Sequence, residues 1–324
     1  MRDAGQPARV LPRSCNSGAG IRPWHFSSSS RRAAFSRDTE DDRILKIANS
    51  EPFVEELIIE PGRAERNYWR DLWRFRELLY FLAYRDILVR YKQTALGVAW
   101  ALLRPALTMA VFVAFRRMTK MPATGVPDAI FVYSALIPWQ FFSNALSEAS
   151  VSLINNSNLI SKVYFPRILV PAGSVVTSLV DFAVTLGLLV VLMLWYRFVP
   201  GWQIFLLIPL TVFTLVLSVG TGLLLAALNV EYRDFRYIVP FIVQFGLFVS
   251  PVAFATSSVP PRWRVLYSLN PLAGIIDGFR WAILRGQTPL DTVTFGISMA
   301  VTTLSLWVGI SYFRRTERSF ADVI

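Results

Sequence analysis

The chain has 324 residues, of which 54% are hydrophobic and only 17% are charged, and its mean hydropathy is +0.44. This composition excludes an ordinary soluble domain, which could not bury so much apolar surface. The formal net charge of +11 does not indicate nucleic-acid binding, because most Lys and Arg residues flank apolar runs, as membrane orientation requires. The single cysteine, Cys15, and the single histidine, His25, exclude an internal disulfide and a Cys/His metal cluster.

Residues 1–60 form a tail rich in Ser, Arg, Gly and Pro, which we predict to be disordered. The next segment, 61–94, is predicted to contain one helix over Trp69–Tyr91. Its apolar stripe and its charged stripe both recur at helical spacing: Leu72, Phe75, Leu79 and Leu82 on one side, and Arg70, Arg74 and Glu77 on another. It carries too many charges to span a membrane, so we predict an amphipathic helix at the membrane interface. A helix of a soluble domain is disfavoured because no such domain follows.

Six apolar stretches follow within 95–324, each close to the 20 or so residues that a transmembrane helix needs. They are Ala95–Phe115, Ala129–Leu146, Ile168–Trp195, Ile204–Leu228, Tyr237–Phe254 and Val293–Phe313. We therefore predict an all-α membrane protein with six transmembrane helices. Between the last two stretches, Pro260-Pro261 and Asn270-Pro271 interrupt residues 257–290, whose apolar part is too short to cross. This segment predicts a re-entrant or surface-lying helical hairpin.

The distribution of cations predicts the orientation. With the N-terminus placed inside, the inner loops from residue 63 onward hold fifteen Lys and Arg residues. The outer loops hold eight: Arg116, Arg117, Lys120, Arg197, Arg262, Arg264, Arg280 and Arg285. This bias favours two cytoplasmic termini and a plasma (inner) membrane location. Arg116, Arg117 and Lys120 oppose the bias, and we expect them to snorkel or to serve an anionic cargo.

A polar and aromatic loop, Asn155–Pro171, separates the second and third stretches. Pro166 and Pro171 prevent one continuous helix, because each lacks an amide donor and restricts the residue before it. Lys162 and Arg167 favour the cytoplasmic side. The loop is therefore predicted to hold a short helix that a cytoplasmic partner can contact.

Motifs for nucleotide or catalytic chemistry are absent from the sequence. It has no G-x-x-x-x-G-K-[ST], no H-E-x-x-H, no G-x-S-x-G and no G-x-G-x-x-G after a strand. We therefore predict no catalytic residue, no cofactor and no metal. Energy for any work must come from a partner or an ion gradient.

Three further features of the spans and loops have structural and functional interpretations. Small residues at helical spacing, Ser218, Gly220, Gly222 and Ala226, predict close helix packing. Arg104 and Asp181 are ionisable groups at membrane depth, which are costly unless paired or facing water, and we predict that they pair. If they do not, Asp181 would line the transport path. The loop residues Glu231, Arg233, Asp234 and Arg236 are either a solvated cluster or a second contact with a cytoplasmic partner.

Four segments together resemble the permease subunit of type-2 ATP-binding-cassette exporters. They are Arg85–Gly97 (RDILVRYKQTALG), Asn158–Arg167 (NLISKVYFPR), Asn229–Tyr237 (NVEYRDFRY) and Phe313–Asp322 (FRRTERSFAD). The branch that they resemble exports lipid-linked polysaccharides such as O-antigen, capsule and teichoic acid. The resemblance covers the chain from about Glu60 to its end.

This resemblance implies a homodimer of six-helix subunits, docked on two copies of a separate cytoplasmic ATP-binding subunit. The coupling segment would comprise Asn158, Ser161, Lys162, Tyr164, Phe165, Pro166 and Arg167. Trp69–Tyr91 would be the interfacial helix, and 257–290 the extracytoplasmic re-entrant hairpin. Aromatic residues that stack on sugars would line a channel, with candidates Phe112, Phe115, Tyr133, Trp139, Phe142, Phe245 and Phe248; ordinary packing or lipid-facing aromatics are the alternative. A small-molecule or drug exporter and a membrane-embedded glycosyltransferase remain as alternative functions.

Overall fold

The computed structural model describes residues 68–92, 97–121, 125–317 and 320, so the predicted tail 1–60 lies outside the described residues. All of the described residues belong to one unit, 60–324. Within them the chain is helical and contains no strand. The predicted class of all-α membrane protein is confirmed, because several of its helices are long and apolar enough to span a membrane.

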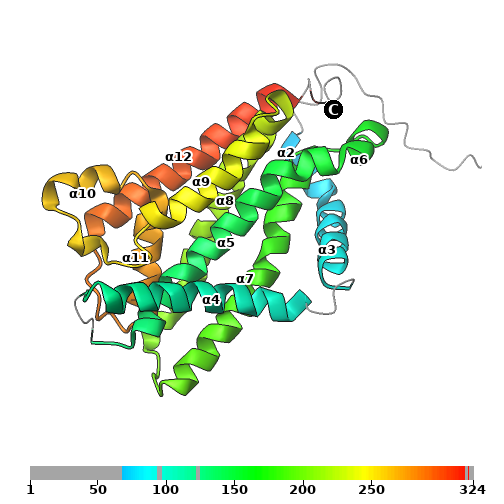
Figure 1. Ribbon diagram of the computed structural model, residues 1–324. Helices are drawn as coiled ribbons and strands as arrows, with labels where there is room; N and C mark the ends of the chain where they lie inside the picture. The colour runs from blue at the N-terminus through cyan, green and yellow to red at the C-terminus, as the bar shows by residue number, and fades with distance from the viewer. Residues whose placement is uncertain (1–67, 93–96, 122–124, 318–319, 321–324) are drawn as a thin grey trace, which may run out of the picture. The chain divides into compact units, whose positions relative to one another are not determined.

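The helices follow one another through the described chain with two short 3-10 turns among them (Figure 1). They are α2 (Tyr68–Arg74), α3 (Arg76–Lys92), α4 (Gly97–Met118), α5 (Asp128–Asn155), α6 (Ser157–Lys162), α7 (Leu169–Trp195), η2 (Trp202–Leu206), α8 (Leu207–Glu231), α9 (Phe235–Val249), η3 (Thr256–Ser258), α10 (Pro261–Tyr267), α11 (Pro271–Ile283) and α12 (Thr292–Thr316). α2 and α3 occupy the predicted amphipathic segment, with a turn at Phe75 between them.

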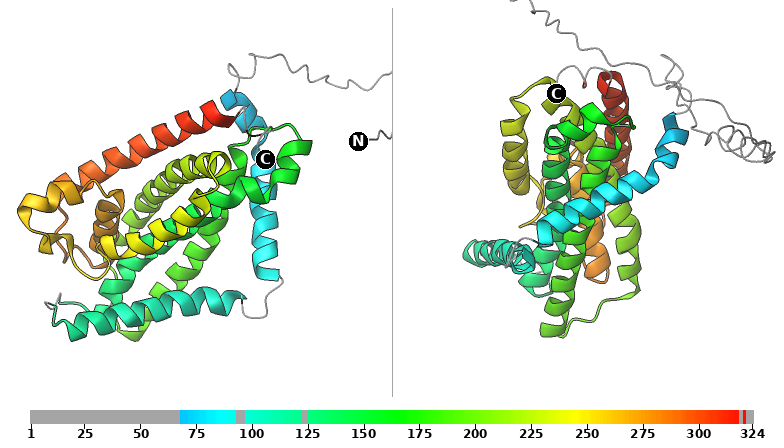
Figure 2. Two further views of the ribbon diagram at one scale, coloured as in Figure 1. Left: turned by 45° about the horizontal axis from the view of Figure 1, so that its top comes forward. Right: turned by 90° about the vertical axis from the view of Figure 1, so that its right-hand side faces the viewer.

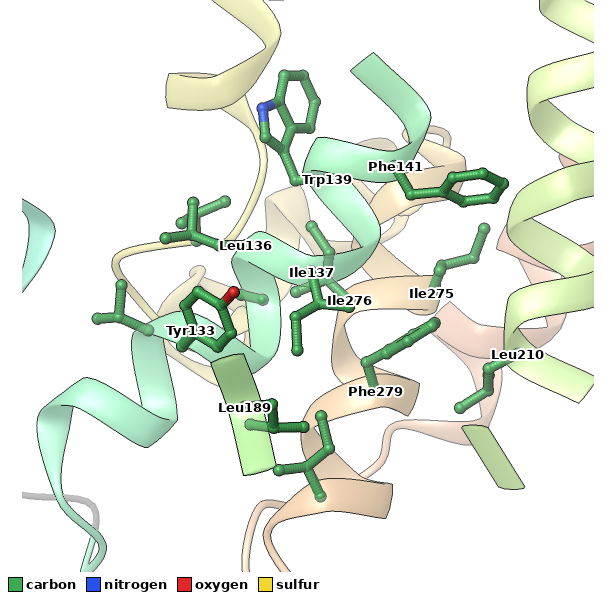
Figure 3. Packing of buried hydrophobic residues seen from close by; sticks show 14 of the residues in the cluster. Tyr133, Leu136, Ile137, Trp139, Phe141, Leu189, Leu210, Ile275, Ile276 and Phe279 are labelled. Carbon is green, nitrogen blue, oxygen red and sulfur yellow. The ribbon is translucent and has the colours of Figure 1, made fainter. Parts of the chain in front are cut away.

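The helix α5 lies at the centre of the bundle and packs against α7, α8, α9 and α11 (Figures 1 and 2). Of its most apolar 18-residue window, 83% is buried, against 17–33% for the other long helices. Figure 3 shows Tyr133 and Ile137 of α5 beside Ile275, Ile276 and Phe279 of α11. All five side chains are fully buried, and they belong to a main core to which α7 and α8 also contribute, with Leu189 and Leu210 among their residues.

Five helical segments are long and apolar enough to cross a membrane: α4, α5, α7, η2 with α8, and α12. The predicted fifth span, Tyr237–Phe254, is not one long helix. α9 has only 15 residues, which is about 22 Å at 1.5 Å per residue. Because the hydrocarbon core is about 30 Å thick, α9 alone is too short, and the count of six crossings stays a prediction.

The sequence explains why α9 ends where it does. Pro251 follows Ser250 directly, and proline restricts the preceding residue to extended backbone. Ser250 indeed has φ −78° and ψ 150°, and its amide closes the helix on Gly246 at 2.9 Å. The chain then continues without regular structure to η3.

Two buried arginines hold the segment that follows α9. Arg280 of α11 donates to the first and third carbonyl groups of Val252–Phe254, at 2.6 and 2.7 Å, and Arg116 of α4 donates to the second at 2.8 Å. Both guanidinium groups lie against the ring of Phe131, with their Cζ atoms 4.0 and 4.4 Å from its centre. Both had been counted as outer-loop cations. The structure instead places them inside the bundle, where they join α4, α5 and α11 to the chain beyond α9.

The predicted hairpin between the last two spans contains α10 and α11. Its second helix begins where the sequence signals it, because Asn270 accepts a hydrogen bond from the amide of Leu272 and Pro271 occupies the first turn. α11 is buried along most of its length. Its re-entrant character stays a prediction.

The small residues of α8 meet α12 and α5 at short range, as their spacing predicted. A Cβ atom added to Gly309 of α12 would lie 2.0 Å from the carbonyl oxygen of Gly220, and one added to Gly220 would lie 2.6 Å from backbone atoms of Leu306. A Cβ on Gly222 would lie 2.9 Å from Ala149 of α5. Backbone atoms cannot yield as a flexible side chain can, so the α8–α12 contact requires glycine at both crossing positions.

Asp181 of α7 is paired, but with a different cation from the one that the sequence predicted. Its carboxylate accepts hydrogen bonds from the guanidinium of Arg90, at 2.6 Å, and from the hydroxyl of Tyr91. The same guanidinium reaches Glu148 of α5 at 2.7 Å. Arg104, the predicted partner, is exposed on α4. The pairing follows the packing of α3 on α7, and it corrects the assumption that a membrane-depth charge must pair within the spans.

We expect Gly309→Ala to lower the free energy of unfolding by about 1–3 kcal/mol, because overpacking against a backbone forces the helices apart. Gly296 is the matched control on the same helix, since a Cβ there meets nothing within 4 Å. Gly296→Ala should be neutral or stabilising by about 0.5–1 kcal/mol, because alanine favours helix. Unfolding of both variants in mixed micelles checks this, and equal effects would contradict the close contact.

A double-mutant cycle on unfolding should give Arg90→Ala and Asp181→Ala a coupling energy of about 0.5–3 kcal/mol, as expected for a hydrogen-bonded ion pair. The matched cycle of Arg104→Ala with Asp181→Ala should give coupling near zero. The pairing described here would be wrong if Arg104 coupled more strongly than Arg90.

Candidate functional site

The loop between α5 and α7 presents a continuous exposed strip. Asn158, Ser161 and Lys162 of α6 are exposed, and Tyr164 just after it is 55% exposed. Val163 between them is 50% exposed. An aromatic ring left in solvent beside a lysine provides apolar area and charge for a protein partner. Of the seven residues predicted to contact a partner, these four have their side chains available.

The other predicted contact residues face inward. Phe165 is 4% exposed and packs in a second apolar cluster with Ile160, Phe313 and Phe320. Pro166 is also buried. The predicted aromatic pair therefore divides into an outward Tyr164 and an inward Phe165. α6 has ended by this point, because the backbone is already extended at Val163 (φ −127°, ψ 132°).

Arg167 is engaged within the chain rather than free for a partner. Its amide donates to the carboxylate of Glu317 at 2.8 Å, and its guanidinium donates to the Glu317 carbonyl at 2.5 Å. The hydroxyl of Tyr68, at the start of α2, donates to the same carboxylate at 3.2 Å. Burial raises the pKa of the Glu317 carboxyl, while the Arg167 amide and the Tyr68 hydroxyl oppose that shift by stabilising the charged form.

Glu317 therefore joins three parts of the chain that are remote in sequence: the end of α12, the start of α2 and the loop after α6. Glu317 lies within Phe313–Asp322, one of the four segments that carry the family resemblance, but the sequence alone predicts no role for it. An acidic residue among the arginines at 314, 315 and 318 is the signal that was present. Its partners could not be predicted, because nothing in the sequence places α2 beside α12.

Hydrogen bonds of Asn156 fix the start of α6. Arg85 of α3 donates to the side-chain oxygen of Asn156 at 2.7 Å and also pairs with Asp86 at 2.7 Å. The side-chain amide of Asn156 donates to the Ser152 carbonyl of α5 at 2.9 Å. The short helix α6 is thus fixed to α3 on one side and to α5 on the other.

The loop between α8 and α9 lies at the same end of the bundle as α6, because the Asn229 side chain of α8 donates to the Ser150 carbonyl of α5 at 2.7 Å. The residues predicted as a solvated cluster or second contact are all exposed: Glu231, Arg233, Asp234 and Arg236. Glu231 accepts a hydrogen bond from Tyr312 at 2.8 Å. The loop therefore extends the exposed polar surface, and both interpretations remain open.

The predicted channel aromatics separate into two groups. Tyr133, Trp139 and Phe142 of α5 are at most 8% exposed, so they pack within the core of this chain instead of lining a path. Tyr133 also donates to the Thr185 carbonyl at 3.0 Å. Their burial corrects the prediction, and its cause is the central position of α5.

The remaining candidates lie on α4 and α9. Phe112 contacts Phe248 with ring centres 6.5 Å apart, while Phe115, Phe245 and Phe248 are about half exposed or more. They form an aromatic surface shared by two helices. Among the described residues, no group of His, Cys, Asp and Glu side chains could hold a metal ion.

Residues 77–284 match the ABC-2 type transporter family. The chain is 28% identical over 258 residues to an O-antigen export system permease protein, RfbA, of Myxococcus xanthus, covering 79% of this chain and 98% of that protein. It is 26% identical to an RfbA of Klebsiella pneumoniae, over 76% of this chain and 95% of that protein. It is 22% identical to the polysialic acid transport protein KpsM of Escherichia coli, over 72% and 92%. Because the matched region covers more than half of its length, the chain belongs to the ABC-2 type transporter family.

Proposed function

We propose that this protein is the membrane-spanning permease subunit of an ABC exporter for a polysaccharide, which is lipid-linked. The observation that carries the proposal is the similarity to O-antigen and polysialic acid permeases along more than nine-tenths of their length. ATP hydrolysis is assigned to a separate cytoplasmic partner. The alternatives, a small-molecule exporter and a glycosyltransferase, gain no support from these relatives.

The exposed residues Asn158, Ser161, Lys162 and Tyr164 are proposed to seat the ATP-binding subunit. The inner side of the same loop is proposed to transmit its movement. Support comes from the contacts of that inner side: Phe165 in the second cluster and Arg167 on Glu317. A displacement of α6 would act on α12 and α2 through Glu317 and on α3 through Arg85. The loop at Glu231–Arg236 is the proposed second contact.

The proposed active assembly is a homodimer with two ATP-binding subunits and a glycan path between the permeases. In its support, large apolar side chains stay exposed on α4 and α9: Trp100, Leu103, Leu107 and Phe115 on the first, and Tyr237, Phe241, Phe245 and Phe248 on the second. Figures 1 and 2 show α4 diverging from the bundle along its N-terminal half. These surfaces would face lipid or a second copy.

We further propose six crossings with both termini cytoplasmic, in the inner membrane. α9 begins beside Glu231, at the end of the bundle that carries α6. The chain after α9 meets Arg116, at the end of α4 remote from α3. The 15 residues of α9 together with Ser250–Phe254 would then make the fifth crossing, and α10 and α11 would lie toward the outer face. The amphipathic α2 and α3 would lie at the inner interface.

Tyr164→Ala should abolish co-purification of the cognate ATP-binding subunit and the export of surface polysaccharide, while leaving the stability of the permease unchanged. Its neighbour is the matched control, because Phe165→Ala empties a buried site and should lower the free energy of unfolding by about 3–5 kcal/mol. Undiminished association and export in Tyr164→Ala would contradict the proposed seat. Export of a small molecule with unchanged surface polysaccharide in a deletion strain would contradict the substrate class.

Cysteines placed singly at Ser258 and Arg315 in a Cys15→Ser background test the orientation. Both positions are exposed, so accessibility to a membrane-impermeant maleimide depends on their side of the membrane. Intact cells should label Ser258→Cys and spare Arg315→Cys, while permeabilised cells should label both. The opposite pattern in intact cells would overturn the proposed topology.

A further inference from the structure

A cationic pocket of about 480 Å³ lies at the end of the bundle remote from α6. It forms where α4 ends, α5 begins and α7 ends. Its polar lining consists of Arg116, Arg117 and Lys120 from α4 and the turn after it, Asp128 from the start of α5, and Tyr196 from the end of α7. Three cations therefore share the lining with one carboxylate.

That carboxylate is already neutralised. Arg116 is 4% exposed and pairs with Asp128 at 3.2 Å, and it also donates to the Ala253 carbonyl. Arg117 and Lys120 differ, because both are exposed and no hydrogen bond or ion pair of their side chains exists within the described part of the chain. The pocket thus keeps two uncompensated positive charges.

The start of α5 adds to this charge, and the backbone holds Lys120 in an unusual conformation beside it. α5 begins after Pro127 without a side-chain cap, so its first-turn amides and helix dipole favour an anion at this end. Lys120 has φ 48°, a left-handed conformation that a non-glycine residue adopts at a cost. The turn therefore keeps Lys120 in a strained backbone at the pocket.

Two large, exposed apolar residues lie next in sequence to residues that line the pocket. Met118, next to Arg117, is 83% exposed, and Trp195, next to Tyr196, is 82% exposed. A large exposed apolar residue beside a cation is costly in water but fits the boundary between acyl chains and headgroups, where Trp and Tyr gather. The chemistry of the pocket and its flanks matches a phosphate attached to an acyl chain.

We propose that this pocket binds the phosphate of an anionic lipid headgroup, through Arg117 and Lys120, with the acyl chains against Met118 and Trp195. The guanidinium of Arg117 can bind phosphate oxygens in a bidentate manner, and the lysine adds a point charge. The proposal rests on the membrane-spanning arrangement above. It explains why two cations lie on the side where the charge bias of membrane proteins disfavours them.

The test measures lipid binding, so it is independent of export and of the ATP-binding subunit. The full chain, purified in phosphatidylcholine nanodiscs containing a spin-labelled phosphatidylglycerol probe, should show an immobilised lipid fraction by EPR. Replacing each cation removes one charge-assisted contact, so Arg117→Gln and Lys120→Gln should each weaken probe binding about ten-fold, and the double variant should abolish it. A spin-labelled phosphatidylcholine probe should show no comparable selectivity.

Arg262→Gln is the matched control, since it removes one exposed arginine outside the pocket. Arg262→Gln should leave probe binding unchanged. If it also lost binding, the probe would respond to the overall charge of the protein, and the proposed site would be wrong. Unchanged binding in the double variant would overturn it as well. Release of the probe by millimolar sn-glycerol 3-phosphate would overturn the lipid as the source of the phosphate. Gel filtration of each variant checks that it is folded. If the double variant is not folded, the binding measured for Lys120→Gln decides the result.

Discussion

The structure depends on burying α5 along nearly its whole length. A buried helix must satisfy its polar groups internally, and α5 does so locally: Ser134, Ser143, Ser150 and Ser152 donate to carbonyls three residues earlier. These four hydroxyl groups therefore need no partner from the helices that cover α5, whereas Tyr133 and the Ser150 carbonyl pair with α7 and α8. Its 28 residues, about 42 Å at 1.5 Å per residue, join the pocket at Asp128 to α6. One helix therefore connects the two ends of the bundle.

At the end of the bundle remote from α6, the chain after α9 leaves helical geometry inside the bundle, so its backbone groups need other partners. Exposed carbonyl groups in an apolar environment each cost several kcal/mol. Arg116 and Arg280 provide the donors for three consecutive carbonyls, and the ring of Phe131 provides a face on which the two cations are also stabilised. Shortening of α9 and burial of two arginines are thus parts of the same arrangement.

Local signals predicted much of the fold. Helical periodicity, Asn270-Pro271 and the small residues of α8 located the amphipathic segment, the start of α11 and a close helix contact. Side-chain partners could not be predicted, since they depend on which helices are neighbours: Asp181 meets Arg90 because α3 packs on α7. Burial of Tyr133 likewise depends on the central position of α5. The loop around α6 was located from its prolines, but only packing shows that Tyr164 faces outward and Phe165 inward.

Burial of Arg116 and Arg280 changes the count of cations on which the charge bias depends. The rule concerns cations that face the aqueous phase beside a span, and buried arginines satisfying carbonyl groups do not belong in it. Removing Arg116 and Arg280 from the outer set leaves six cations against fifteen on the inner side. Arg117 and Lys120 are then the outer cations nearest a span end that have no protein partner in the described chain. These two cations oppose the proposed orientation when they are counted alone, and a negatively charged headgroup beside them would remove that conflict.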